Sequence, residues 1–178
     1  LVLAGAVIYA LGGWKSAVVL AVSLAVNFAF AKAMEKTSVP GRALLTVPVV
    51  LNAALLFVFK YTGFVLTNLN ALGASFALPE LMLPLGISFF TFQQIAYLAA
   101  VYKKELPRAD ALDYLAYILY FPKLLMGPLM DPVDFVTQLN DASLKRPNAE
   151  NIAAGLKLFS FGLFKKLLLA DTFAKAVA

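Results

Sequence analysis

The amino-acid sequence predicts an all-α, multi-pass transmembrane protein that contains one broken or re-entrant segment. Of the 178 residues, 62% are hydrophobic and only 14% are charged, and the mean hydropathy is +0.83. A soluble domain is about half apolar and about a quarter charged, so this chain departs from the soluble average in both respects. Its apolar runs are numerous, and several approach the roughly 20 residues that a membrane-spanning helix needs. We therefore expect residues 1–178 to form a single membrane domain.

Composition also excludes several kinds of chemistry. The sequence has no cysteine and no histidine, so it has no thiolate nucleophile and lacks the usual general base and the commonest metal ligand. The net charge of +5 comes from basic residues that are scattered between apolar runs, a pattern typical of membrane flanks rather than of a nucleic-acid surface. No phosphate-binding glycine loop, metal-ligand spacing or nucleophile elbow is present. These residues predict no catalytic residue, no metal site and no nucleic-acid partner.

Polar stretches divide the chain into helical segments. The predicted membrane segments are residues 1–11, 16–31, 44–60 and 81–102, a broken or re-entrant segment 111–130, an interfacial segment 131–151 and a last span 152–170. The chain begins in an apolar run without Met or a basic region, which is unlike a signal peptide, and it stops without a helix-ending signal. We therefore expect the sequence to be truncated at both ends.

Turn residues and polar runs set the boundaries of the first four segments. Gly12-Gly13 closes the first segment, and the turn pair Pro40-Gly41 lies in the polar run that separates the second from the third. The third segment passes into a less hydrophobic tail that contains Asn68 and Asn70. Lys103-Lys104 closes the fourth segment.

Basic residues occupy alternate loops. Loop 32–42 contains Lys and Arg, loop 61–80 contains neither, and loop 103–108 contains both again. The residues in question are Lys32, Lys36, Arg42, Lys103, Lys104 and Arg108. Because cytoplasmic loops are enriched in Lys and Arg, the first and third of these loops are predicted to be cytoplasmic.

The segment 111–130 is apolar but interrupted. Pro122 and Pro128, with Gly127 between them, remove backbone donors and disrupt a helix. Backbone groups freed in this way survive at membrane depth only if they are buried in protein or line a watery cavity. A full span would also place Lys145 and Arg146 outside the cell, against the charge rule, so we favour a re-entrant hairpin. Residues 131–151 then form a surface helix or a solvated connector at the cytoplasmic interface.

The fourth span contains the run Pro84-Leu85-Gly86-Ile87-Ser88, followed by Thr91, Gln93 and Gln94. Pro84 and Gly86 are expected to bend or open its first turn. Helical spacing places Ser88 and Thr91 on one face, with Gln94 at its edge and Gln93 on another side. These residues either pack against neighbouring helices or form the polar wall of a tunnel, and the physical argument leaves both interpretations open.

Lys123 lies inside the interrupted segment, between Pro122 and Leu124. A lysine at membrane depth is costly unless it reaches the interface or finds a partner, so it is a candidate site residue. The alternative is that its side chain extends from a shallow re-entrant loop to the interface.

The run of residues 83–93, LPLGISFFTFQ, followed by Tyr97 and Val101-Tyr102, resembles the membrane-bound O-acyltransferase family. The similarity is to the bacterial branch that includes alginate O-acetylation proteins and the teichoic-acid D-alanine transfer protein. Further pieces agree in order and spacing: Phe59-Lys60-Tyr61, Tyr120-Phe121-Pro122-Lys123 with Gly127-Pro128, and Gly162-Leu163-Phe164-Lys165-Lys166 with Ala170-Asp171. The sequence departs from the family at Ala100, where an acid is usual, and at Met130-Asp131, where an arginine is common.

The resemblance implies a membrane-bound O-acyltransferase of the bacterial cytoplasmic (inner) membrane. It would transfer an acetyl or D-alanyl group to hydroxyls of an extracytoplasmic polysaccharide or cell-wall polymer. It implies an acyl thioester donor, carried by acyl carrier protein or coenzyme A on the cytoplasmic side, no bound cofactor, and an extracytoplasmic acyltransferase partner. The family's catalytic histidine is expected on a later helix, and this chain alone is expected to be inactive. The residues expected to line the tunnel are Pro84, Gly86, Ser88, Thr91, Gln93, Gln94, Pro122, Lys123, Gly127 and Pro128.

Two other classes of function fit a membrane protein with interrupted helices. A transporter or channel would use discontinuous helices around its substrate, usually within an inverted repeat, and the sequence contains no such repeat. A structural membrane protein would acylate no polymer in cells. Transport of a solute without acyl transfer would favour the first of these alternatives.

Overall fold

The computed structural model describes residues 2–77, 79, 81–106, 110–124, 127 and 129–177. Every regular element within these ranges is a helix, which confirms the all-α prediction. The chain divides into two compact units, residues 1–137 and 138–178, and each is described by itself. The helices that begin in the first unit are α1 (Val2–Leu11), α2 (Trp14–Glu35), α3 (Arg42–Leu56), the π-helical η1 (Phe57–Tyr61), α4 (Thr62–Ala71), α5 (Ile87–Tyr102), α6 (Ala111–Ile118), α7 (Phe121–Leu124) and α8 (Pro132–Asn140).

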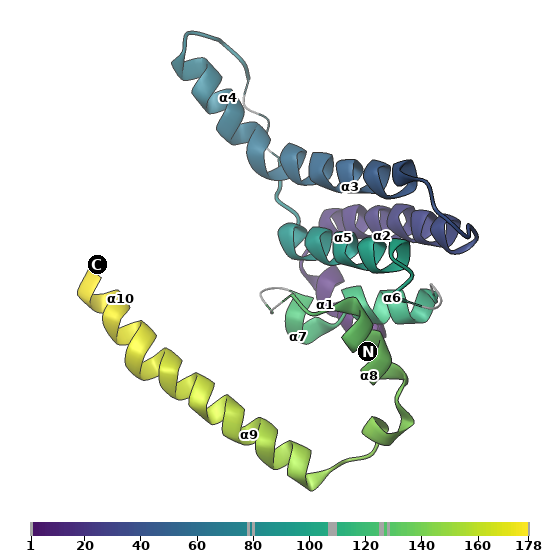
Figure 1. Ribbon diagram of the computed structural model, residues 1–178. Coiled ribbons are helices and arrows are strands. Elements are labelled where there is room, and N and C mark those ends of the chain that lie inside the picture. The colour runs from purple at the N-terminus through teal and green to yellow at the C-terminus, as the bar shows by residue number, and fades with distance from the viewer. Residues whose placement is uncertain are drawn as a thin grey trace. The chain divides into compact units, whose positions relative to one another are not determined.

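Helices α2, α3 and α5 pack against one another and form the centre of the first unit (Figure 1). One stripe of α2 faces its neighbours because buried residues recur every three or four positions. This stripe consists of Ser16, Leu20, Ser23, Leu24, Asn27, Ala31 and Met34. Small and polar residues let membrane helices approach closely, whereas Val18, Val22 and Val26 on the outer side are exposed and apolar, as expected of a surface that faces lipid.

Contacts at the two ends of this bundle fix the direction of its helices. The Lys104 ammonium, which follows α5, donates to the backbone oxygens of Met34 (2.9 Å) and Thr37 (2.7 Å) at the end of α2. At the opposite end, the Tyr9 hydroxyl of α1 donates to the Leu85 carbonyl before α5 (2.6 Å). Helices α2 and α5 therefore run in the same direction, and α3 packs on both in the opposite direction. The two basic loops predicted to share one side of the membrane lie at the same end of the bundle; Arg108 lies outside the described residues.

Two helical runs among the described residues, α2 and Arg42–Ala71, are long and apolar enough to cross a membrane. The second run comprises α3, η1 and α4, so it extends well beyond the predicted segment 44–60. The helix continues because the π-turn absorbs the change of pitch at Phe57–Tyr61 instead of ending the helix. The asparagines of the predicted tail are therefore helical, and the Asn68 amide donates to the Phe64 carbonyl.

Helix α5 begins at Ile87, later than the predicted start at residue 81. Gly86 occupies the N-cap in the left-handed region (φ 65°), a conformation that a residue with a side chain rarely adopts. Pro84 and Gly86 therefore precede the helix rather than bend it. The Ile87 amide closes this turn onto the Pro84 carbonyl (3.2 Å).

The predicted interruption of segment 111–130 is present. Helix α6 has only eight residues, about 12 Å of rise, and its N-terminus is capped by the Asp110 carboxylate, which accepts from the Leu112 amide (2.8 Å). The chain breaks after Ile118, before Pro122 rather than at it. Pro122 falls in the first turn of α7, where its missing backbone N–H removes no intrahelical hydrogen bond.

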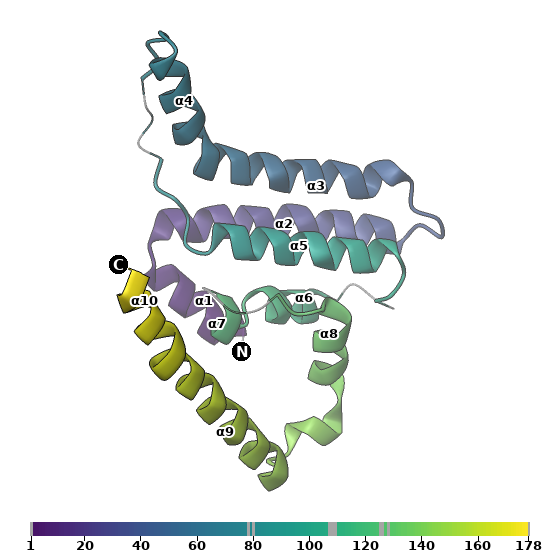
Figure 2. The same cartoon turned by 60° about the vertical axis from the view of Figure 1, so that its left-hand side comes forward.

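The second unit is a turn followed by a continuous helical run (Figure 2). The turn is η2 (Ala142–Lys145), and the run comprises α9 (Ala149–Phe164), the π-helical η3 (Lys165–Ala170) and α10 (Asp171–Val177). The Ser143 hydroxyl and amide donate to the exposed Asp141 carboxylate, which holds the pKa of Asp141 below its ordinary value. Apolar side chains such as Ile152, Leu158 and Phe173 are exposed on this run, a composition that suits a helix surrounded by lipid or by other membrane helices.

Candidate functional site

The polar residues of α5 are buried. Thr91, Gln93 and Gln94 each have 0% of their surface exposed, whereas Ser88 is half-buried. Gln93 was predicted to lie on a different side from the others, yet it is equally buried, because α5 packs against α2, α3 and α6 on several sides. The Ser88 hydroxyl lies 3.4 Å from the Lys60 ammonium, which joins the start of α5 to the π-turn η1.

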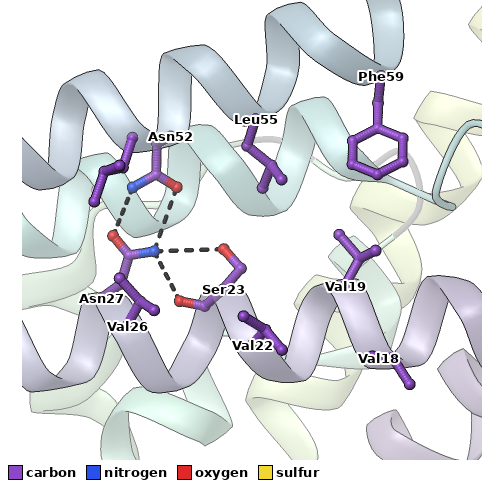
Figure 3. Close-up of a pocket in the computed structure, with 10 residues that line it drawn as sticks. Val18, Val19, Val22, Ser23, Val26, Asn27, Asn52, Leu55 and Phe59 are labelled. Atoms are coloured by element: carbon purple, nitrogen blue, oxygen red, sulfur yellow. Dashed lines mark hydrogen bonds between the residues drawn. The ribbon is translucent and has the colours of Figure 1, made fainter.

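Gln94 is the centre of a buried hydrogen-bonded cluster. Its Oε1 accepts from the hydroxyls of Ser23 (3.1 Å) and Tyr114 (3.2 Å) and from the Asn27 amide. Asn27 in turn exchanges amide hydrogen bonds with Asn52 of α3, as Figure 3 shows. We call these five residues the Gln94 cluster; it connects α2, α3, α5 and α6.

The sequence reasoning identified only Gln94 in this cluster. The available signal was the presence of Ser23 and Asn27, spaced by one helical turn, inside an otherwise apolar span, and of Asn52 in the next span. Polar side chains inside apolar membrane helices commonly bond across helix interfaces.

We expect Asn27→Leu and Asn52→Leu each to lower the thermal stability of the full-length protein in detergent. Each single change leaves a buried amide without its partner, which costs about 1–3 kcal/mol. The double variant removes both partners, so its loss of stability should be clearly smaller than the sum of the single losses. Melting temperatures of the four proteins measure this coupling, and strictly additive losses would contradict the pairing.

A second feature of the site is a row of buried tyrosines. Tyr114 lies against Tyr97 (ring centroids 4.8 Å apart), which lies 6.1 Å from Tyr117. None of the three exposes more than 1% of its surface. The Tyr117 hydroxyl donates to the Met130 carbonyl (2.7 Å), which ties α6 to the chain after the interruption. The tyrosine row therefore connects the Gln94 cluster to the interrupted segment.

Lys123 lies at the far end of this row. Its ammonium is 3.6 Å from the ring centroid of Tyr117 and 4.7 Å from that of Phe135, and only 2% of the residue is exposed. The side chain therefore does not extend to the surface of this unit, and aromatic faces supply its electrostatic stabilisation. Gly127 lies close behind: its amide donates to the Lys123 carbonyl (3.1 Å), and a Cβ at Gly127 would lie only 2.3 Å from the Lys123 Cα.

Several of these buried groups have no hydrogen-bond partner among the described residues. They are the Thr91 hydroxyl, both polar ends of the Gln93 amide, the Gln94 Nε2 and the Lys123 ammonium. Buried polar groups are nearly always paired, so each unpaired group calls for an explanation such as a bound water or ligand. Their occurrence on α5 and α7, at the two ends of the tyrosine row, favours the tunnel interpretation over pure packing.

The remaining predicted tunnel residues differ in their burial. Pro84 is buried and Gly86 is half-buried at the start of α5, whereas Pro122 is exposed on α7. Pro128 lies outside the described residues.

The structure thus connects Gln94 and Lys123 through the tyrosine row. In the described part of the chain, no group of three or more carboxylates or other metal ligands comes together. The site consists of amides, aliphatic hydroxyls, phenols and one buried ammonium. Such groups can bind and orient a polar ester or thioester.

Comparison with known proteins identifies the family. Residues 87–178 match the MBOAT, membrane-bound O-acyltransferase, family. The chain is 35% identical to the peptidoglycan O-acetyltransferase of Helicobacter pylori, over 98% of this chain and 38% of that protein. It is 35% identical to the probable alginate O-acetylase AlgI of Pseudomonas aeruginosa, over 73% of this chain and 26% of the relative. The corresponding protein of Pseudomonas putida is 33% identical, over 76% of this chain and 28% of the relative.

The chain thus spans between about a quarter and two fifths of the length of these relatives. No solved structure matches it. The family match covers half of the chain, including α5, the interrupted segment and the second unit. The chain belongs to the membrane-bound O-acyltransferase family and is part of a membrane-integral protein.

Proposed function

We propose that the full-length protein transfers an acetyl group to hydroxyls of an extracytoplasmic cell-wall polymer or polysaccharide. The observation that carries this proposal is the family match together with relatives named as peptidoglycan and alginate O-acetylases. These names favour acetyl over D-alanyl as the transferred group. Peptidoglycan is the first acceptor to test, because the relative named for it aligns with nearly the whole chain.

We propose further that the protein crosses the bacterial cytoplasmic membrane several times, with the Lys104 end of the bundle in the cytoplasm. The hydrogen bonds that join the two basic loops at that end support this orientation. In this proposal, the short helices α6 and α7 form a re-entrant segment. The length of α6 supports re-entry, because a helix of about 12 Å is too short to cross a hydrocarbon core of about 30 Å.

The proposed donor is an acyl thioester, on an acyl carrier protein or coenzyme A, that enters from the cytoplasmic side. The acceptor hydroxyl would attack the thioester carbonyl, its proton would pass to a base, and the donor thiol would leave. The unpaired Lys123 ammonium suits the role of holding the carbonyl oxygen, where negative charge develops. The unpaired amide groups of Gln93 and Gln94, at the other end of the tyrosine row, suit binding another polar group of the substrates. The base is proposed to be the family's histidine, contributed from outside this chain. An extracytoplasmic partner would carry the first acceptor hydroxyl, and the acetyl group would pass from it to a hydroxyl of the polymer in a second transfer.

The test is made in cells that lack the gene. Mild alkali releases ester-linked acetate from purified peptidoglycan, and we expect the deletion to remove this acetate and the full-length gene to restore it. Residues 1–178 expressed alone, at a matched membrane level, are expected to restore none. Unchanged ester acetate in the deletion strain would contradict peptidoglycan as the acceptor, and restoration by residues 1–178 would contradict the need for an outside base.

A further inference from the structure

An open groove runs between α2 and the α3–η1 helix, with a volume of about 340 Å³. Its lining residues are Val18, Val19, Val22, Ser23, Val26, Asn27, Leu51, Asn52, Leu55 and Phe59. Figure 3 shows the Asn27–Asn52 pair at one end of the groove and Phe59, with Val18 and Val19, toward the other. The groove lies outside the tyrosine row, and its inner end shares Ser23, Asn27 and Asn52 with the Gln94 cluster.

The chemistry of the lining selects a hydrocarbon occupant. The polar groups at the inner end already bond to one another, because Asn27 donates to the Ser23 carbonyl (2.8 Å) and exchanges bonds with Asn52. Asn52 also donates to the Pro48 carbonyl (2.7 Å). With its amides paired, the groove offers valine, leucine and phenylalanine surface and no donor that requires a polar ligand.

The length of the groove matches one leaflet of a bilayer. Val18 and Asn27 lie nine residues apart on α2, which corresponds to about 13 Å of helix rise. This is about half of a hydrocarbon core of about 30 Å. An acyl chain that enters at the Phe59 end would therefore reach the asparagine pair near the middle of the membrane.

Each of the two helices that line the groove carries a lysine near one end of it, and the Lys60 ammonium also lies 3.4 Å from the Ser88 hydroxyl. Lys15 precedes Val18 and Val19 by about one helical turn, so it shares their face of α2, and Lys60 follows Phe59. Lys15 is the only charged residue between positions 1 and 31, and Lys60 the only one between 43 and 79. Trp14 and Tyr61, whose rings lie within 6 Å of these ammonium groups, are exposed as is usual for aromatic residues at a membrane interface.

We propose that this groove binds one acyl chain of an anionic phospholipid, whose headgroup phosphate is held by Lys15 and Lys60. Charge complementarity at the mouth commits the site to an anionic lipid, because no carboxylate of the sequence lies between residues 36 and 79 or before residue 35. The bound lipid would lie beside the Gln94 cluster and would anchor α2 and α3 to one leaflet.

The experiment uses the full-length protein, stripped of lipid in mild detergent and titrated with phosphatidylglycerol or phosphatidylcholine, with native mass spectrometry to count bound lipids. We expect one tightly retained phosphatidylglycerol. Leu55→Trp, which fills the groove, should reduce its retention at least about fivefold, whereas Leu56→Trp, next in sequence but outside the lining, should leave it unchanged. Lys15→Gln should weaken phosphatidylglycerol binding about fivefold, the contribution of one lysine at a membrane surface, and Lys36→Gln should not.

Val22→Phe fills the groove from α2 and provides a second variant if Leu55→Trp does not fold. The proposal would be overturned if the groove-filling and control variants retained phosphatidylglycerol equally well. It would also be overturned if the protein bound phosphatidylglycerol and phosphatidylcholine equally and Lys15→Gln did not change that binding. Full-yield cross-linking of a cysteine at position 55 to another membrane segment of the same protein would also overturn it, because that segment would then occupy the groove.

Discussion

Gly5→Val in α1 is expected to destabilise the full-length protein and to reduce acyl transfer at least about tenfold. A Cβ at Gly5 would lie 1.9 Å from the carbonyl oxygen of Leu119 and 2.9 Å from its carbonyl carbon. These are backbone atoms at the interruption between α6 and α7, so neither can yield by a change of rotamer. The valine must therefore push α1 away from the break, and overpacking of this kind costs about 3 kcal/mol.

Thermal denaturation in detergent and the ester-acetate assay measure the two effects. Gly63→Ala in α4 is the matched control, because nothing lies within 4 Å of the position that its Cβ would occupy. That substitution replaces glycine by a better helix former and should leave the melting temperature unchanged or slightly raised. If Gly5→Val melts and functions like the wild type, α1 does not pack on the break as described.

Hydropathy predicted where the long helices lie but not where they end. Segment 16–31 became α2, Trp14–Glu35, because a helix extends through its polar last turn once Lys32 pairs with Glu35 (2.7 Å). The helix after Arg42 likewise runs past residue 60 to Ala71. An average over side chains reports the solvent that surrounds a segment, whereas backbone hydrogen bonding decides how far the helix continues.

The Gln94 cluster and the tyrosine row could be predicted only in part. Tyr97 follows Gln94 by one turn on α5, and Tyr114 and Tyr117 share a face of α6, so each half of the row follows from helical spacing. These two faces meet because α5 and α6 pack against each other, and the periodicity within one helix does not predict which helices pack together. The same limit explains Gln93, whose burial depends on the neighbours of α5 and not on its own spacing.

Lys123 illustrates the opposite case, in which one residue out of pattern made the interrupted segment a candidate site. Its burial under Tyr117 and Phe135 required the structure, because Phe135 belongs to α8, beyond the break. The sequence therefore predicted an unusual lysine, and the fold supplies the aromatic faces that make its burial tolerable.

Lys123→Met is expected to leave the full-length protein folded and to reduce acyl transfer by about tenfold to a hundredfold. Methionine preserves most of the buried volume, and the lost cation–π contact, worth about 2 kcal/mol, is offset by removal of a buried charge. If the ammonium holds the carbonyl oxygen in the transition state, its loss costs about 1.5–3 kcal/mol, which corresponds to the predicted fall in rate.

The readouts are the melting temperature in detergent and the rate of acetate-ester formation at a matched amount of folded protein. Phe135→Leu is the companion variant: it weakens the aromatic contact of the ammonium but keeps the charge, so it should lose much less activity than Lys123→Met. Wild-type rates for Lys123→Met would show that the unpaired ammonium takes no part in transfer. A large loss of stability would show instead that the lysine holds α6 and α8 together through its contacts with Tyr117 and Phe135. Without such a role, the removal of a buried charge should not unfold the protein.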